Sequence, residues 1–454
     1  MKKLIRSHKD SFLYGLTYLL TIFPPLLLLM MIFRFNINFP FYDQWDFIPT
    51  LVSLKTGTLT FAQLWAQHNE HRIFFPRTIM VILAAMSGWD IRWQIGMNFL
   101  LGVGIFLALS YLFYNRVIKQ GGIDIPLLFP ILSFFIFSLN QWENWFWGWQ
   151  IQILLNVLAV IIGIIFLTSN RLSWRSFLLS LVCGFIATFS FATGIMYWPM
   201  GFILLCLQIF LSKKKQWHFI ALWIGATFFV YFLYMWGYKV PPNPPSRWVI
   251  AHQPFEFATY ILVFLGSPIL AFNVAGALFV GIVGIVLFII TVKLLHAQLA
   301  KYRTLLLPCF GLSLYTIFCA FMTGVGRAAF GPEQAASSRY QTFSQLFWIA
   351  LTVCLLVSLK KAWEGRKEKR IATLDFLFLT LFLLVTTASA SMLLSMQVIS
   401  QRYHVLLLVR NEMLANGSRE DKTRLYAQIY SFPDLIPEKL SILKTYNLSF
   451  YRQQ

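Results

Sequence analysis

Two carboxylates, Asp43 and Asp46, lie three residues apart in the segment FYDQWDF. The segment follows an apolar stretch long enough to cross a membrane, so both acids are expected at the edge of the bilayer. Tyr42 and Trp45 would partly shield Asp43 from water, and desolvation makes a carboxylate more basic, as a general base near neutral pH requires. We therefore predict that Asp43 is a catalytic base and that Asp46 orients a substrate or holds a cation. The alternative is that both acids are interfacial groups that pair with arginines and face water.

The segment HNEHR places His68 and His71 three residues apart, with Glu70 and Arg72 beside them. On a helix this spacing would bring both imidazoles to one face, where they could share a metal ion. No third strong ligand is near in the sequence, so a hydrogen-bonding cluster that holds a polar or phosphorylated ligand is the interpretation that we favour. Glu70 is a further candidate to orient the substrate or to hold a divalent cation, and Arg77 is a further candidate for ligand binding.

Residues 140–150 read NQWENWFWGWQ and combine Glu143 with several tryptophans. Tryptophan is enriched at membrane interfaces, so an aromatic belt is one interpretation of this segment. Carbohydrate sites, however, commonly combine flat aromatic faces with amide and carboxylate groups in the same way. We therefore predict that Glu143, Trp142, Trp145 and Trp147 contribute to substrate binding.

Residues 324–340 read GVGRAAFGPEQAASSRY and form a glycine-containing loop with Arg327, Arg339 and Tyr340. A guanidinium group binds two oxygens of a phosphate at once through its planar fork, and small residues let the backbone approach a ligand. These three residues are therefore predicted to bind a phosphorylated substrate. The alternative is a flexible loop whose arginines reach toward the membrane surface.

The composition indicates what kind of fold positions these residues. Of the 454 residues, 58% are hydrophobic and only 12% are charged, and the mean hydropathy is +0.67. The apolar residues fall in blocks that fit helices across a hydrocarbon core of about 30 Å. Lysine and arginine give a net charge of +20, but they stand in short clusters between the blocks, a pattern that orients membrane proteins and does not indicate binding to nucleic acid. The sequence predicts an all-α, polytopic membrane protein.

A threading with eleven spans places all basic clusters on one side, which we take as the cytoplasm. The N-terminus is then cytoplasmic and the C-terminus extracytoplasmic. We expect the membrane to be a bacterial inner (plasma) membrane. We expect a transmembrane domain over residues 1–396, with a first outer loop at 34–93, and a small extracytoplasmic helical tail at 397–454. The apolar stretches 73–90 and 256–270 are expected to lie in the outer interface. The expected spans are 12–33, 94–114, 125–140, 151–168, 175–192, 196–212, 217–237, 272–292, 304–323, 341–359 and 373–395.

The order of features in residues 42–112 resembles the N-terminal part of the GT-C glycosyltransferases, especially the aminoarabinose and protein O-mannosyl transferases. In that family a span leads into an outer loop with an acidic motif, a glycine, a His/Lys-Pro-Pro segment and an interfacial helix, and a second span then ends in a basic cytoplasmic turn. Glu143 corresponds to the acid of the next outer loop. The second acid here stands three residues after the first, and the double proline is absent. The corresponding features are YDQWD at 42–46, Gly57, HNEHR with Pro76 and Arg77, residues 73–90 and the turn at 115–119.

The resemblance implies a GT-C-like fold that transfers a sugar from a polyprenyl-phosphate donor to a lipid or glycan acceptor by one inverting displacement, with Asp43 as the base. A divalent cation is an optional cofactor in this interpretation. The residues themselves agree with a lipid-borne donor, because the short cytoplasmic connections leave no room for a nucleotide-binding domain and nucleotide sugars are not normally present outside. Two alternatives stay open. A transporter or flippase for a lipid-linked sugar would need the arginines and tryptophans but no base, and a structural subunit of a polysaccharide assembly complex would not need the acids.

Overall fold

The computed structural model describes residues 2–170, 172–212, 216–241, 249–296, 299–364, 371–415 and 419–453. Within these residues the regular structure is helical, apart from an isolated β-bridge between His68 and His71. Nine segments of the described residues are long and apolar enough to cross a membrane. The prediction of a polytopic helical membrane protein is therefore confirmed.

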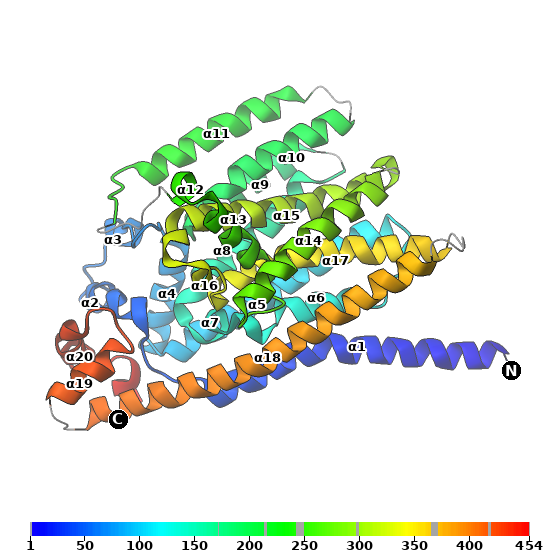
Figure 1. Cartoon of the computed structure of the whole chain (residues 1–454). Helices are drawn as coiled ribbons and strands as arrows, with labels where there is room; N and C mark the ends of the chain where they lie inside the picture. Colours follow the sequence, from blue (N-terminus) through cyan, green and yellow to red (C-terminus); the bar gives the residue numbers. More distant parts are fainter. Residues whose placement is uncertain are drawn as a thin grey trace.

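The nine long segments form a bundle, and shorter helices gather mainly around one end of it (Figure 1). The long helices are α1 (Lys2–Phe35), α5 (Ile91–Phe113), α8 (Ile151–Leu167), α10 (Tyr197–Ser212), α11 (Trp217–Met235), α14 (Val274–His296), α15 (Leu299–Arg327), α17 (Gln341–Glu364) and α18 (Ile371–Leu414). The shorter helices are α2 (Ile48–Lys55), α3 (Phe61–Trp65), α4 (Phe74–Ser87), α6 (Leu128–Ile136), α7 (Trp142–Phe146), α9 (Trp174–Thr188), α12 (Val249–His252), α13 (Pro254–Gly266), α16 (Pro332–Ala335), α19 (Arg419–Ala427) and α20 (Ile436–Thr445).

Two of the eleven expected spans are shorter than expected. The stretch 125–140 contains α6 with only 9 residues, and the stretch 175–192 contains α9 with 15. At 1.5 Å per residue these helices rise about 14 and 22 Å, less than a hydrocarbon core of about 30 Å. Part of the apolar run at 125–140 is irregular backbone that is buried inside the protein, where its polar groups find partners. The stretches 73–90 and 256–270, expected not to cross, form the 14-residue α4 and the 13-residue α13.

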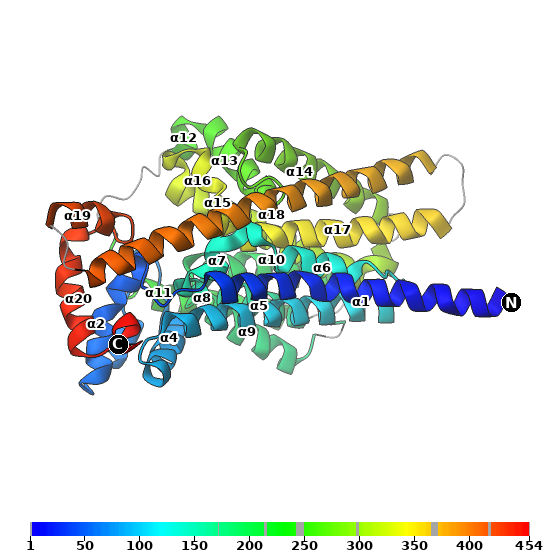
Figure 2. The same ribbon diagram turned by 90° about the horizontal axis from the view of Figure 1, so that it is seen from below.

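The two ends of the bundle carry different parts of the chain. In Figure 1 the N-terminus of α1, the end of α17, the start of α18 and the adjoining ends of α10 and α11 all lie toward the same end of the bundle. At the opposite end lie α2, α3, α19 and α20, and Figure 2 shows the same division from below. The basic cluster at 213–215 lies outside the described residues, as do residues 171, 297–298 and 365–370, which belong to three further clusters. The orientation of the two ends across a membrane stays a prediction.

The C-terminal tail begins later than expected and is docked on the first outer loop. Helix α18 has 44 residues and continues to Leu414, so the expected boundary at 396/397 falls inside a continuous helix. The described residues 419–453 then fold back toward the start of the chain. The backbone N–H of Tyr42 donates to the Ile429 carbonyl at 2.7 Å, and the N–H of Ser449 donates to the Gly88 carbonyl at 3.0 Å. The tail is therefore part of the surroundings of Asp43 and Asp46.

Candidate functional site

The HNEHR segment is a tight turn and not a helix, which corrects the expectation of a helical histidine pair. His68 and His71 exchange two backbone hydrogen bonds of 2.8 Å each, and Asn69 has a φ of +48° in the left-handed region. The turn directs the imidazoles to different partners. The Nε2 atom of His68 lies 3.8 Å from Asp43 Oδ2, whereas Nε2 of His71 lies 3.6 Å from Glu70 Oε1. The geometry therefore pairs each histidine with an acid.

Asp43 lies in a short 3₁₀ helix, η1 (Tyr42–Phe47), and is more open to solvent than the sequence suggested. Its side chain is 33% exposed, because Tyr42 points outward with 37% exposure and Trp45 is fully buried in the core. Tyr42 has a φ of +45°, a strained conformation for a residue with a side chain. Asp43 is thus accessible to a ligand, with His68 beside it. The exposed fraction does not support the expected desolvation by Tyr42 and Trp45.

Asp46 is engaged by two residues of the tail that the sequence did not suggest. The hydroxyl of Tyr430 donates a hydrogen bond to Asp46 Oδ1, and Lys439 Nζ lies 3.7 Å from the same oxygen. Lys439 also donates to the Trp45 carbonyl at 2.8 Å and sits 5.1 Å from the centre of the Tyr430 ring. Asp46 therefore anchors the tail to the acidic loop.

Removing this anchor is expected to loosen both segments. In the double variant Lys439→Met and Tyr430→Phe, Asp46 loses a cation and a hydrogen-bond donor, and hydrogen bonds to charged groups are worth about 1.5–3 kcal/mol. Amide hydrogen exchange over residues 42–47 and 429–443 should then become about tenfold faster or more. The exposed Lys444 offers a matched control, Lys444→Met, which should exchange like the wild type. Unchanged exchange in the double variant would refute the anchor.

Asp43, Asp46 and His68 could together supply three ligand atoms to a cation, since these atoms lie within 4.8 Å of one another. Two carboxylates and an imidazole suit several divalent metals. Asp46 already accepts a hydrogen bond from Tyr430 and faces the charge of Lys439. A divalent cation would have to compete with Lys439 for Asp46, so these residues fit a resident metal poorly in this arrangement.

Glu70 forms an ion pair with Arg327 across a long separation in sequence. Burial by itself raises the pKa of Glu70, but the attraction of His71 and Arg327 outweighs it and lowers the pKa to about 2. Burial lowers the pKa of His71 to about 4, and its ring stacks on Phe191 with 4.2 Å between centroids. Because His71 is neutral at pH 7, Arg327 is the cation that faces Glu70 there.

His71, which is mostly buried, makes the stability of the protein depend on pH in a defined window. Between the ordinary pKa of 6.5 and the folded value of about 4, the unfolded chain binds a proton that the folded chain does not. Stability is therefore expected to fall as the pH is lowered from about 6.5 to 4. His71→Gln should flatten this part of the pH profile of the unfolding temperature, whereas the control His404→Gln, at an exposed position, should not. An unchanged slope in His71→Gln would contradict the assignment.

Arg72 and Arg77 donate to carbonyl groups at helix ends. Arg72 Nε donates to the Tyr234 carbonyl at 2.6 Å, and its Nη2 donates to the carbonyl of Trp236, just after α11. Arg77 Nη1 donates to the carbonyls of Gln63 and Leu64, at 3.0 and 2.9 Å, and so caps α3. Helix ends leave carbonyls without partners, and arginine side chains satisfy them here. These hydrogen bonds give both arginines a structural role near the site.

Glu143 joins the tryptophan-rich segment, residues 140–150, to the arginine loop, residues 324–340. Its Oε2 accepts hydrogen bonds from the hydroxyls of Ser337 and Ser338, at 3.1 and 2.7 Å, and from the N–H of Arg339 at 3.1 Å. The guanidinium of Arg339 lies 5.5 Å from the ring centre of Tyr340 and interacts electrostatically with both Glu143 and Asp43. The fold therefore brings Arg339 into electrostatic interaction with two acids, Asp43 and Glu143, from two other segments of the chain.

The tryptophans serve mostly as packing. Trp145 is fully buried and its Nε1 donates to the Ser138 carbonyl at 2.9 Å. Trp147 is also buried and donates to the Phe41 carbonyl at 3.0 Å. Trp142 is only partly buried and lies beside Arg402, a residue of α18 that the sequence did not single out. Of the three, Trp142 is the one placed to contact a ligand.

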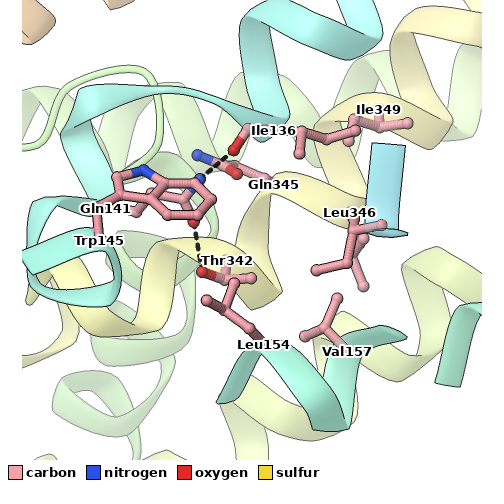
Figure 3. A pocket seen from close by; sticks show the side chains of 10 residues that line it. Ile136, Gln141, Trp145, Leu154, Val157, Thr342, Gln345, Leu346 and Ile349 are labelled. Carbon is pink, nitrogen blue, oxygen red and sulfur yellow. Dashed lines mark hydrogen bonds between the residues drawn. The ribbon is translucent and has the colours of Figure 1, made fainter. Parts of the chain in front are cut away.

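A small cavity lies behind the tryptophan-rich segment, inside the bundle (Figure 3). Gln141, Trp145, Thr342 and Gln345 form its polar side, and Thr342 donates a hydrogen bond to Gln141. Leucine, isoleucine and valine side chains from several helices form the rest. Apart from Trp145, the predicted site residues do not line it.

Comparisons with protein-family models, curated proteins and solved structures found no match. Evidence about function therefore comes from the residues of the site and their place in the fold.

The site residues that lie near one another form what we call the outer cluster. Two close pairs of ionisable groups connect its members, His68 with Asp43 and Glu70 with Arg327. Electrostatic interactions add three further connections, between His71 and Asp43, between Arg327 and Arg339, and between Arg402 and Glu143. Its members are Asp43, His68, Glu70, His71, Glu143, Arg327, Arg339 and Arg402.

Proposed function

We propose that this protein is a GT-C-type membrane glycosyltransferase that moves a sugar from a polyprenyl-phosphate donor to an acceptor at the outer face of the membrane. The observation that carries the proposal is that segments far apart in the sequence bring an accessible acid, Asp43, into electrostatic interaction with Arg339, a mostly buried cation. A base and a phosphate-binding group must face the same site if a sugar is to pass from a lipid phosphate to an acceptor. The nine apolar segments among the described residues would provide the membrane setting in which such a donor is held.

The proposed reaction is a single displacement at the anomeric carbon of the sugar. Asp43 takes the proton of the acceptor hydroxyl or amine as the acceptor atom forms its bond to the anomeric carbon. The bond between that carbon and the phosphate oxygen breaks, and the phosphate keeps the electron pair. The configuration at the anomeric carbon inverts, and polyprenyl phosphate is the second product.

Other members of the outer cluster support this chemistry from fixed positions. His68 lies 3.8 Å from Asp43 and orients it, and the Glu70–Arg327 pair holds the turn against the arginine loop. Asp46 lies outside the cluster, and its contacts with Tyr430 and Lys439 of the tail keep residues 42–47 in place. The divalent cation considered from the sequence has no step in this proposal.

The proposal is tested by the products. Purified protein in nanodiscs is given a polyprenyl-phosphate sugar, labelled in the sugar, with glycan or lipid acceptors from a bacterial envelope. We expect label in an acceptor, one polyprenyl phosphate released per sugar transferred, and inverted configuration at the new linkage. Retention of configuration would contradict the single displacement, and a donor that stays intact with every acceptor class would contradict the transferase.

A further inference from the structure

Tyr42 is held in a backbone conformation that a residue with a side chain rarely adopts. Its φ of +45° lies in the left-handed region, and such a conformation persists only where the surrounding structure fixes it. Glycine would adopt it without strain, so the backbone gives no reason for a tyrosine at this position. Strained residues of this kind gather at ligand sites, and the side chain of Tyr42 is therefore a candidate to bind a ligand.

Hydrogen bonds to three distant segments fix the backbone on both sides of Tyr42. Its N–H donates to a backbone carbonyl of the tail at 2.7 Å, and the Phe41 carbonyl accepts from Trp147 Nε1 at 3.0 Å. Gln44 Oε1 accepts from the Phe41 N–H at 3.1 Å, and Gln44 Nε2 donates to Gln94 Oε1 of α5 at 2.7 Å. These hydrogen bonds hold the strained residue in one conformation.

The ring of Tyr42 rests on other aromatic rings and is open on the remaining side. It lies edge-on to Phe41, with 4.4 Å between the ring centres and 85° between the planes, and its centre is 6.1 Å from that of Trp147. Trp147 is buried and cannot itself stack on a sugar, whereas Tyr42 is 37% exposed. The face of an aromatic ring is electron-rich and attracts the C–H groups of an apolar sugar face, and a ring that is already fixed loses little entropy on binding.

We propose that Tyr42 binds the acceptor by stacking on a pyranose ring, so that the acceptor is a glycan. This inference rests on the proposed function and names its acceptor class. Tyr42 directly precedes Asp43, and consecutive Cα atoms lie about 3.8 Å apart, so a sugar on this ring would lie close to the base. The donor phosphate is assigned to the mostly buried Arg339, whereas Tyr42 is exposed, which favours the acceptor over the donor as the ligand of Tyr42.

Saturation-transfer NMR tests the binding without sugar transfer. Wild-type protein in nanodiscs is mixed with millimolar maltotriose, cellotriose or chitotriose, which are soluble pyranose oligomers, and the aromatic protons of the protein are saturated. At least one oligomer should bind, with the strongest transfer on the C–H groups of one pyranose face. Tyr42→Leu should weaken its binding about two- to tenfold, the usual contribution of a well-placed aromatic contact. Tyr42→Phe, which keeps the ring, should bind within about twofold of the wild type.

Two further variants separate binding from folding. Tyr42→Gly relieves the strain at this φ, so its unfolding temperature should at least match that of Tyr42→Leu, yet it should bind the sugar as weakly. Tyr114→Leu is the matched control, because Tyr114 is an exposed tyrosine just after α5, and it should bind as the wild type does. Unchanged binding in Tyr42→Leu, or no binding of any oligomer to the wild type, would overturn the proposal.

A second titration distinguishes the acceptor from the donor sugar. Decaprenyl-phosphate mannose and decaprenyl monophosphate are titrated into the same preparations, and Tyr42→Leu should bind both as the wild type does. A loss of affinity for the sugar-bearing lipid alone would assign Tyr42 to the donor and overturn the acceptor assignment. Tyr42-dependent binding of the oligomer without any sugar transfer would contradict the proposed function alone. Transfer to a glycan with an unchanged KM for that glycan in Tyr42→Leu would contradict this inference alone.

Discussion

Asp43→Asn is expected to lower the rate of sugar transfer by about 10²–10⁴-fold, the usual contribution of a general base. The substitution keeps the size and polarity of the side chain but removes the oxygen that accepts the proton. Binding of decaprenyl monophosphate should stay near the wild-type level, because Arg327 and Arg339, which are predicted to bind the phosphate, are unchanged. The rate of transfer and the affinity for the lipid phosphate, measured on the same preparations, separate the two effects.

Two other acids at the same end of the bundle serve as comparisons. Asp90 caps α5 and pairs with Arg92, so Asp90→Asn should leave transfer near the wild-type rate. Asp46→Asn should loosen the tail and lower transfer less than Asp43→Asn does, because Asp46 is engaged by Lys439 and Tyr430. A wild-type rate of sugar transfer in Asp43→Asn would show that Asp43 is not the base. A larger loss of rate in Asp46→Asn than in Asp43→Asn would make Asp46 the base instead.

Glu143→Ala is expected to destabilise the protein by about 3 kcal/mol or more. The substitution leaves two serine hydroxyls and the N–H of Arg339 without their acceptor, and each buried polar group left unpaired costs about 1–3 kcal/mol. Glu143→Gln keeps one carbonyl oxygen and should cost about half as much. Chemical unfolding in mixed micelles, followed by tryptophan fluorescence, measures both changes.

The exposed Glu333 lies in the same loop and provides the control for this series. Glu333→Ala should leave stability within about 0.5 kcal/mol of the wild type, as surface substitutions usually do. A Glu143→Ala variant as stable as Glu333→Ala would show that the carboxylate does not hold the arginine loop. The proposed placement of Arg339 would then lose its support.

The sequence indicated the elements of the fold better than their local geometry. Long apolar blocks are a strong signal because a bilayer requires long helices. The stretch 73–90, expected not to cross, forms a short helix, in agreement with the Pro76 and Arg77 that it contains. The stretch 125–140 was misjudged because buried irregular backbone can be as apolar as a helix. The spacing of His68 and His71 suggested a helix, but two backbone hydrogen bonds close a turn there. Hydrophobic periodicity carries no information about such a turn.

The candidate site could be predicted only in part from the sequence, because it depends on contacts between distant segments. Arg72 and Arg339 are the same residue type beside similar neighbours, yet one donates to helix-end carbonyls and the other faces Asp43. Only the fold shows which donors are already used. Lys439 and Tyr430 lie in a polar tail that carries no motif, so nothing in the sequence linked them to Asp46. Arg402 offered a weak signal, a cation soon after the last expected span.

The most direct test of the central claim follows the bond between sugar and phosphate in proteoliposomes. A polyprenyl-phosphate sugar labelled in both its sugar and its lipid is placed in the leaflet that the outer cluster faces, together with an acceptor. The account predicts that wild-type protein separates the two labels, with the sugar on the acceptor and the lipid as its monophosphate, and that Asp43→Asn leaves them joined. Movement of the intact, doubly labelled lipid to the other leaflet, equally in the wild type and in Asp43→Asn, would contradict the account and identify a carrier.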